Sequence, residues 1–182
     1  MELKPAEAKK LIQPHPLTIV TTTNKEGVPD AATFSWISPV SAEPPLVCIM
    51  VSEERQTYEN LEENGEFVIN IITKHCLEDA VYLGTKSFKD EPEKMENTEL
   101  TLEKGKEAKA SRINEAIGWI ECEVKDMVKE GDHYMVVGKV LGGAVADEFW
   151  KDGRLKVEEA ETLHHLGGNE FLTPGEVIEF KK

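Results

Sequence analysis

The stretch DAATFSWISPVSAEPPLVCIMV, residues 30–51, joins two different strand patterns and decides the expected fold. Residues 31–38 alternate small or hydroxylated side chains with aromatic ones, whereas residues 46–51 are continuously apolar. Alternation is typical of a half-buried strand, and a short apolar run bounded by prolines is typical of a strand buried on both faces. Pro39 interrupts the first pattern because proline has no backbone N–H to donate. The stretch therefore predicts two consecutive strands with a break between them.

Strand signals continue on both sides of this stretch. Residues 18–23 are almost entirely β-branched, and a turn containing Gly27 and Pro29 leads back to residues 31–38, which predicts a hairpin. Further strands are expected at 66–72, at 116–129 paired with 133–146, and near 177–180. About seven short strands in mostly antiparallel order favour a β-barrel or sandwich over a parallel α/β sheet.

The expected helices are few and short. Caps and stop signals predict a helix after Pro5, one that Thr57 caps and Gly65 ends, one over 73–83, and one over 157–166 that ends at Gly167 and Gly168. Residues 84–112 show no clear period and are expected to form a long loop with a short strand near Leu100. Loops of this length in compact domains are usually functional or mobile.

The composition indicates a folded, acidic chain. With 182 residues, 40% of them hydrophobic, the chain is expected to form a single domain over residues 1–182. Its 35 acidic and 21 basic residues give a formal charge of −14, and the basic residues are scattered, so binding to nucleic acid or to an anionic membrane is electrostatically unfavourable. The first residues, MELKPAEAKK, contain no apolar targeting segment, and a cytoplasmic location is expected.

Cysteine and histidine spacing argues against a metal site. Cys48, Cys76 and Cys122 are an odd number without a C-x-x-C spacing, which suits a reducing compartment and neither a disulfide framework nor a zinc site. His164 and His165 are adjacent, and on the expected helix their side chains diverge by about 100°. We therefore expect no metal.

Two consecutive segments carry candidate binding residues. In an extended strand, Thr33 and Ser35 point to one side while Phe34 and Trp36 point to the other, which sets a hydroxyl-lined patch opposite an aromatic anchor. Backbone amides beyond the break at Pro39 need acceptors, and a planar ligand rich in carbonyls and ring nitrogens supplies them. The alternative is that the hydroxyls form the wet face of an ordinary edge strand.

The second segment begins where the apolar strand ends. Ser52, Arg55 and Thr57 precede or open the next helix, and a helix N-terminus offers free amides and a partial positive charge. Together they predict a compact anion site, for which a phosphate is the fitting ligand. The alternative is that Thr57 only caps the helix and Arg55 pairs with a neighbouring glutamate.

Five segments in one order give the chain a family resemblance. They are PLTIVTTTNKEGVPDAATFSWISPVSAEPPLVCIMV, RQTYENLEENGEFVINI, RINEAIGWIECEV, GDHYMVVGKV and LHHLGGNEF. With them the chain resembles the flavin reductase-like, FMN-binding split-barrel proteins, and in particular the flavoredoxin-like branch. The resemblance implies a mainly β fold, a Greek-key split β-barrel with a few short peripheral helices, and a homodimer with FMN near its interface.

The resemblance also implies roles for individual residues. Thr33, Phe34, Ser35 and Trp36 would meet the isoalloxazine ring, and Ser52, Arg55 and Thr57 would meet the phosphate. Lys86 and Lys89 of the long loop would close over the phosphate, the alternative being that they are solvated surface charges. His133, which matches a family histidine in the tripeptide GDH, either faces the site or is satisfied by a backbone carbonyl.

Three functional hypotheses follow. The first is an NAD(P)H-linked flavin reductase or flavoredoxin-type oxidoreductase with FMN as cofactor and no catalytic side chain of its own. No G-x-G-x-x-G occurs, so a nicotinamide would dock against the exposed flavin face. The second is an FMN-bound electron carrier that exchanges electrons with a redox partner protein, and the third is a ligand-free β-barrel interaction module. Asn169 stands after the glycine pair, where reductases that turn over free flavin often carry arginine, which weakens the case for diffusible flavin as substrate.

Overall fold

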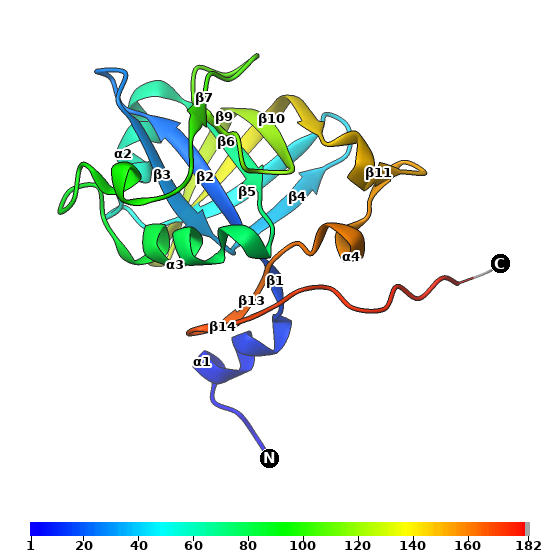
Figure 1. Ribbon diagram of the computed structural model, residues 1–182. Helices are drawn as coiled ribbons and strands as arrows, with labels where there is room; N and C mark the ends of the chain where they lie inside the picture. The colour runs from blue at the N-terminus through cyan, green and yellow to red at the C-terminus, as the bar shows by residue number, and fades with distance from the viewer. Residues whose placement is uncertain (181–182) are drawn as a thin grey trace.

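The computed structural model describes residues 1–180, and its centre is a seven-stranded antiparallel sheet in the order β3-β2-β6-β9-β10-β5-β4 (Figure 1). Its strands are β2 (Thr18–Thr23), β3 (Pro29–Phe34), β4 (Ile37–Ser41), β5 (Leu46–Val51), β6 (Glu66–Ile71), β9 (Gly118–Glu130) and β10 (His133–Val145). The predicted strands at 18–23, 46–51 and 66–72 and the long hairpin after residue 116 are therefore confirmed.

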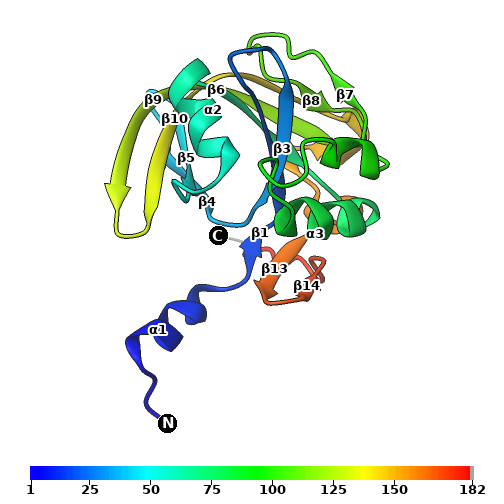
Figure 2. The same cartoon turned by 90° about the vertical axis from the view of Figure 1, so that its left-hand side faces the viewer.

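The order of the strands forces the sheet to curl. Its two edge strands, β3 and β4, are joined only by Ser35 and Trp36, and three residue steps reach at most about 11 Å. The edges must therefore lie close together, and the sheet closes into a barrel (Figure 2). Because β3 and β4 do not pair with each other, the barrel keeps an open seam between them. We use "seam" for this junction, residues 34–37.

The connection from β5 to β6 gives the barrel its Greek-key character. It skips β9 and β10, which lie between these strands in the sheet, and it carries helix α2 (Gln56–Asn64). Two register shifts in the β9–β10 pair, after Val137 and after Val140, add curvature. At Gly138 an added Cβ would lie 2.5 Å from the Phe67 ring, so only glycine lets β10 pass this buried aromatic.

Two apolar clusters hold the barrel and its outer layer together. The interior cluster consists of Val20, Phe34, Ile49, Val51, Leu61, Phe67, Ile69, Cys122 and Val136. The outer cluster, which includes Ile19, Ala31, Ile72, Ala80, Leu83, Ile113 and Leu163, lies between the sheet and helix α3 (Leu77–Thr85). Neighbouring residues on β2, Ile19 and Val20, belong to different clusters, which explains why this strand is apolar on both faces.

The remaining elements are short. The helical ones are α1 (Pro5–Ala8), η1 (Lys9–Ile12), η2 (Lys74–Cys76), η3 (Lys94–Asn97), η4 (Asp147–Phe149) and α4 (Val157–Ala160). The strands are β1 (His15–Pro16), β7 (Leu102–Glu103), β8 (Arg112–Ile113), β11 (Trp150–Lys151), β12 (Arg154–Leu155), β13 (His164–Gly167) and β14 (Glu170–Leu172). Among residues 1–180, no helix is long and apolar enough to cross a membrane.

Four local predictions were wrong. The strand breaks at Ser35 and Trp36 and not at Pro39, which lies within the edge strand β4, where a proline is tolerated. Helix α2 begins at Gln56 with Arg55 as its N-cap residue, so Thr57 lies inside the helix and does not cap it. The predicted helix over 157–166 ends at Ala160, because β13 instead pairs with β1 and β14 and draws His164 and His165 into a strand. The predicted strand near 177–180 is absent, since this segment extends away from the barrel without a pairing partner (Figure 1).

Candidate functional site

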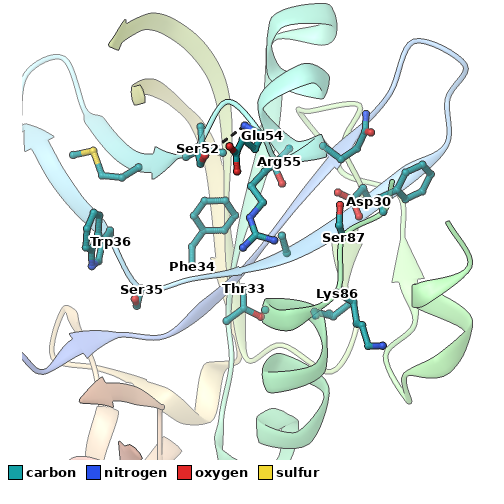
Figure 3. Close-up of a pocket in the computed structure, with 18 of the residues that line it drawn as sticks. Asp30, Thr33, Phe34, Ser35, Trp36, Ser52, Glu54, Arg55, Lys86 and Ser87 are labelled. Atoms are coloured by element: carbon teal, nitrogen blue, oxygen red, sulfur yellow. Dashed lines mark hydrogen bonds between the residues drawn. The ribbon is translucent and has the colours of Figure 1, made fainter. Parts of the chain in front are cut away.

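A cavity of about 430 Å³ opens at the seam, within the size range of small-molecule sites (Figure 3). Four parts of the chain form its walls. They are the end of β3 with the seam, the end of β5 with the start of α2, the end of α3 with the segment that leads to η3, and the start of β10. His133 lines the cavity, as do eight of the nine residues predicted to bind cofactor; Lys89 does not. The eight are Thr33, Phe34, Ser35, Trp36, Ser52, Arg55, Thr57 and Lys86.

One end of the cavity is aromatic. Phe34 packs into the barrel core, whereas Trp36 is 40% exposed at the rim. The Trp36 ring lies 5.2 Å from that of His133, at an interplanar angle of 39°. Because β3 ends at Phe34, the strict alternation predicted for residues 33–36 does not continue through the seam, and side chains of both kinds reach the same cavity.

The hydroxyl side of this segment is tied to the outer helix. Thr33 Oγ1 donates to the carbonyl oxygen of Ala80 on α3 at 2.6 Å. An added Cβ at Gly84 would lie 3.4 Å from the Thr33 Cβ, so α3 packs directly on β3 here. Thr33 therefore fixes the position of α3 and of the segment after it, in addition to lining the cavity.

The other end of the cavity is positively charged. After β5 the backbone turns, with the Arg55 N–H donating to the Ser52 carbonyl at 3.1 Å, and this turn delivers the N-terminus of α2 to the cavity. The first amides of a helix have no acceptor inside it. Arg55 extends into the cavity between Phe34 and Ser87 (Figure 3), and within residues 1–180 its guanidinium forms no ion pair or hydrogen bond. In an acidic chain, an unpaired guanidinium directed into a cavity indicates an anionic ligand.

A second cation at this end was missed in the sequence. Lys94 is 1% exposed and lines the cavity, and its Nζ lies 2.8 Å from the carboxylate of Asp30, which is also buried. Burial raises the pKa of Asp30, against the opposing effect of the nearby Lys94 ammonium. A lysine in a long polar loop carries no sequence signal of burial, because only the packing of the loop against β3 takes it out of water.

The two lysines predicted to close over a phosphate are engaged elsewhere. Lys86 Nζ lies 3.2 Å from Glu91 and also over the Tyr82 ring, and Figure 3 shows its side chain directed away from Arg55. Lys89 Nζ lies 2.5 Å from Glu59 on α2. Both side chains are therefore neutralised by glutamates, and neither ammonium points into the cavity in this conformation.

The histidines fall into two groups. His133 lines the cavity, with its Nδ1 2.8 Å from the Asp132 carboxylate. His165 lines a neighbouring cavity of about 200 Å³, where it stacks on Phe171 at 5.2 Å and its Nε2 lies 3.0 Å from the Gly168 carbonyl oxygen. On β13, His164 and His165 point to opposite faces. Among residues 1–180, no cluster of three or more metal-ligating side chains forms.

The geometry selects a class of ligand. A ligand for this cavity needs an anionic group at the α2 end, where Arg55, Ser52 and the helix amides converge. It also needs a flat, apolar body at the seam, where Phe34 and Trp36 lie. Within residues 1–180, the three cysteines are buried free thiols that do not line the cavity, and burial raises their pKa, so they offer it no reactive thiolate.

Comparison with known proteins agrees with the fold. The sequence model of the flavin reductase like domain matches residues 12–158. Flavoredoxin from Methanosarcina acetivorans is 21% identical with a TM-score of 0.87, covering 99% of this chain and 94% of that chain. Nitrilotriacetate monooxygenase component B from Bacillus cereus is 26% identical with a TM-score of 0.85, covering 98% and 95%. An FMN-binding protein from Thermus thermophilus is 19% identical with a TM-score of 0.87, covering 100% and 98%. The expected split β-barrel is confirmed.

Proposed function

Because this chain belongs to the flavin reductase-like domain family, we propose that it is a flavoprotein that binds FMN in the seam cavity and acts as a flavin reductase- or flavoredoxin-type oxidoreductase. The observation that carries the proposal is the unpaired Arg55 guanidinium at one end of a cavity whose other end is aromatic. The monophosphate of FMN supplies the anion, and its isoalloxazine supplies the flat body. The FMN-binding protein from Thermus thermophilus, which shares the fold, gives further support.

The residues present fit this cofactor. Ser52, Arg55, Thr57 and the first amides of α2 would hold the phosphate. The buried Lys94 adds positive charge to the same end, and Asp30 compensates for part of it. Thr33, Phe34, Ser35 and Trp36 would border the ring, and Met50 and His133 would complete that wall.

FMN, when bound, supplies the capacity to accept a hydride and to pass electrons on singly. This chain's own residues orient it, exclude water on the Phe34 side and leave the rim near Trp36 open to a second reactant. We propose NAD(P)H as the electron donor. The sequence has no G-x-G-x-x-G, so the nicotinamide would dock at the open rim and not in a Rossmann site. We assign no catalytic acid or base to the chain.

A second candidate is an electron carrier without nicotinamide activity. The formal charge of −14 favours it, because an acidic surface steers a basic redox partner protein. We further propose a cytoplasmic location, which suits three free thiols.

A visible spectrum distinguishes these candidates. The protein is expected to be yellow after purification or after incubation with FMN, and to lose this colour under anaerobic conditions on addition of NADH or NADPH. A yellow protein that dithionite bleaches and nicotinamides do not would favour the electron carrier. A preparation that stays colourless after incubation with excess FMN would refute flavin binding and leave a ligand-free interaction module.

We also propose that the protein is a homodimer with FMN near the interface. The cavity is open at the seam, and large apolar side chains surround this region without cover: Trp36, Val40, Leu11 and Ile12 are between 40% and 74% exposed. Lys9 of the N-terminal arm already reaches the Trp36 ring, at 5.3 Å from its centroid. A second copy placed over this rim would bury the apolar side chains and cover the exposed edge of the flavin.

A further inference from the structure

The segment 86–93, here called the strap, forms one wall of the seam cavity at its anion end. We propose that the strap is a retention device for the cofactor. Its tip is fastened to α2 by the Lys89–Glu59 ion pair, and this fastening slows the release of FMN. The inference rests on the proposed binding of FMN and deepens it.

The strap is in a position to control access. Three consecutive residues of it, Lys86, Ser87 and Phe88, line the cavity, as does Lys94 directly after it. Ser87 faces Arg55 across the anion end (Figure 3). A ligand phosphate held by Arg55 would therefore have α2 on one side and the strap on the other, so that release would require the strap to move.

The backbone of the strap is held by its own turns and at its start, where the Lys86 N–H donates to the Tyr82 carbonyl of α3 at 3.1 Å and the Lys86 carbonyl accepts from Lys94 Nζ at 3.5 Å. Asp90 and Glu91 N–H groups both donate to the Ser87 carbonyl, at 3.1 and 2.9 Å, and Lys94 N–H donates to Glu91 at 3.1 Å. Within residues 1–180, no backbone hydrogen bond joins residues 86–93 to the barrel sheet. The position of the strap therefore depends on side-chain contacts.

Those contacts differ between base and tip. At the base, Glu91 accepts from Asn97 at 2.9 Å and from Tyr82 Oη, and it pairs with Lys86 at 3.2 Å. The buried Lys94–Asp30 pair then fixes the start of η3 to β3. At the tip, Lys89 and Glu59 form one ion pair at 2.5 Å, with side chains that are 40% and 45% exposed. The base is thus firmly fixed, and the tip is fastened by a contact that water and salt can weaken.

The Lys89–Glu59 ion pair at the tip is weak enough for the strap to open and strong enough to change how often it does so. An exposed ion pair of this kind shifts an equilibrium by about two- to fivefold. If FMN leaves only when the strap is open, its dissociation rate follows the open population and changes by the same factor. Retention is then set by residues that do not touch the cofactor, and Lys89 acts as a positioning residue. The alternative is that Lys89 contacts the phosphate directly.

Exchanging the charges of Lys89 and Glu59 distinguishes a positioning role of Lys89 from a direct contact between Lys89 and the phosphate. Lys89→Glu and Glu59→Lys each break the pair, and the double variant restores it with reversed polarity. We expect each single variant to release FMN about two- to fivefold faster than wild type, and the double variant to return to within about twofold of wild type. A direct phosphate contact would not be restored, because the double variant places a glutamate where the lysine was.

Dissociation is measured by stopped-flow fluorescence after mixing the FMN-loaded protein with an excess of an apo-flavodoxin trap. Lys25→Glu, which breaks the exposed Lys25–Glu63 pair (3.5 Å) at the other end of α2, is the matched control and is expected to leave the rate unchanged. Raising NaCl should accelerate release more from wild type than from a Lys89→Ala/Glu59→Ala variant.

Two results would overturn the inference: single variants that release FMN at the wild-type rate, or a double variant as fast as the singles. Both leave FMN binding itself intact. Wild-type protein that takes up no FMN would instead refute the proposed function, so the two failures are distinguishable.

Discussion

Arg55 and Lys94 bring the same charge to the same end of the cavity, but the protein holds them in opposite ways. Arg55 is exposed and unpaired within residues 1–180, at the N-cap of a helix, whereas Lys94 is buried and paired with Asp30. Removing Lys94 or Asp30 would leave a buried charge without its partner, which costs about 3–5 kcal/mol of stability. Arg55 is therefore the residue at which ligand binding can be tested without loss of the fold.

Arg55→Ala is expected to weaken FMN binding by about 1.5–3 kcal/mol, the usual contribution of a charge-assisted hydrogen bond, and to leave the unfolding midpoint unchanged. Quenching of FMN fluorescence measures the affinity, and Lys25→Ala, a comparable exposed cation away from the cavity, is the control. If Arg55→Ala binds FMN as tightly as wild type, the phosphate lies elsewhere, with Lys86 and Lys94 the remaining lysines of the cavity lining.

At the scale of elements, helix α2 and the loop before β8 show how backbone amides are used in two ways. The N-terminal amides of α2 open into the cavity, where a ligand anion can accept from them. The amides of residues 106–108 are instead satisfied internally, because they converge on the buried carboxylate of Glu121 on β9 at 2.6–3.0 Å. The Glu121 carboxylate thus accepts from the loop amides as a ligand phosphate would accept from those of α2.

Comparing riboflavin with FMN tests whether the N-terminal amides of α2 bind the phosphate. Riboflavin has the same ring as FMN but lacks the phosphate, so it cannot accept from the helix N-terminus or from Arg55. We expect riboflavin to bind about 10- to 100-fold more weakly than FMN, and the Arg55→Ala variant to narrow this ratio. Both affinities come from the same fluorescence titration. Equal affinities for the two flavins would exclude the α2 end as a phosphate site.

Glu121 gives a prediction of pH dependence. Burial alone would raise the pKa of this carboxyl, but the N–H donors of residues 106–108, with the nearby Arg112, bring it below its ordinary value. A pKa lowered by folding stabilises the native state above the unfolded pKa of about 4.3, and this stabilisation is lost as the pH falls through the folded value.

Glu121→Gln should therefore lower the free energy of unfolding by about 1.5–3 kcal/mol at pH 7, since the amide keeps only one acceptor oxygen for the three N–H groups. The difference from wild type should shrink as the pH falls through the lowered pKa of the folded state, below which the wild-type carboxyl is also neutral. Urea unfolding across pH 3–7 measures it. A difference that is constant over this range would show that the charge of Glu121 does not matter.

At the scale of the whole molecule, the unpaired edge strands at the seam create the cavity and also leave it open to solvent. A barrel whose edge strands paired with each other would have no cavity there, and this chain leaves Trp36 and the N-terminal arm exposed beside the opening. An interface that covers them and encloses a cofactor should belong to the larger class, on the order of 2,000 Å² or more in total.

We therefore expect light scattering at micromolar concentration to give twice the mass of the chain, with and without FMN. Trp36→Ala with Leu11→Ser should shift this mass toward that of the monomer, because both changes remove apolar area from the proposed interface. Val28→Ser, an exposed apolar residue in the turn before β3, is the control. A monomeric wild type in both conditions would exclude a site shared between two copies.

The amino-acid sequence by itself determined which segments are strands and where the candidate ligand residues stand along the chain. Alternation in 31–38 and continuous apolarity in 46–51 are local properties; residues 46–51 are strand β5, whereas residues 31–38 contain the end of β3 and the start of β4. Thr33 to Trp36 were predicted from strand alternation and Arg55 from the start of a helix, which are also local signals, and all of them line the cavity. The segments 157–166 and 177–180 failed because their helix and strand signals were local, whereas β13 was decided by distant partners on β1 and β14.

Tertiary structure alone decided which charges meet. Lys86, Lys89 and Lys94 look alike in a polar loop, yet one is held by Glu91, one by Glu59 on α2, and one is buried against Asp30 on β3. No local pattern distinguishes them, because a lysine's pairing depends on which carboxylate the fold brings within a few ångströms and on how much water remains there. The cavity has the same origin: it exists because a two-residue link joins the two edges of a seven-stranded sheet, a fact about strand order that no single strand contains.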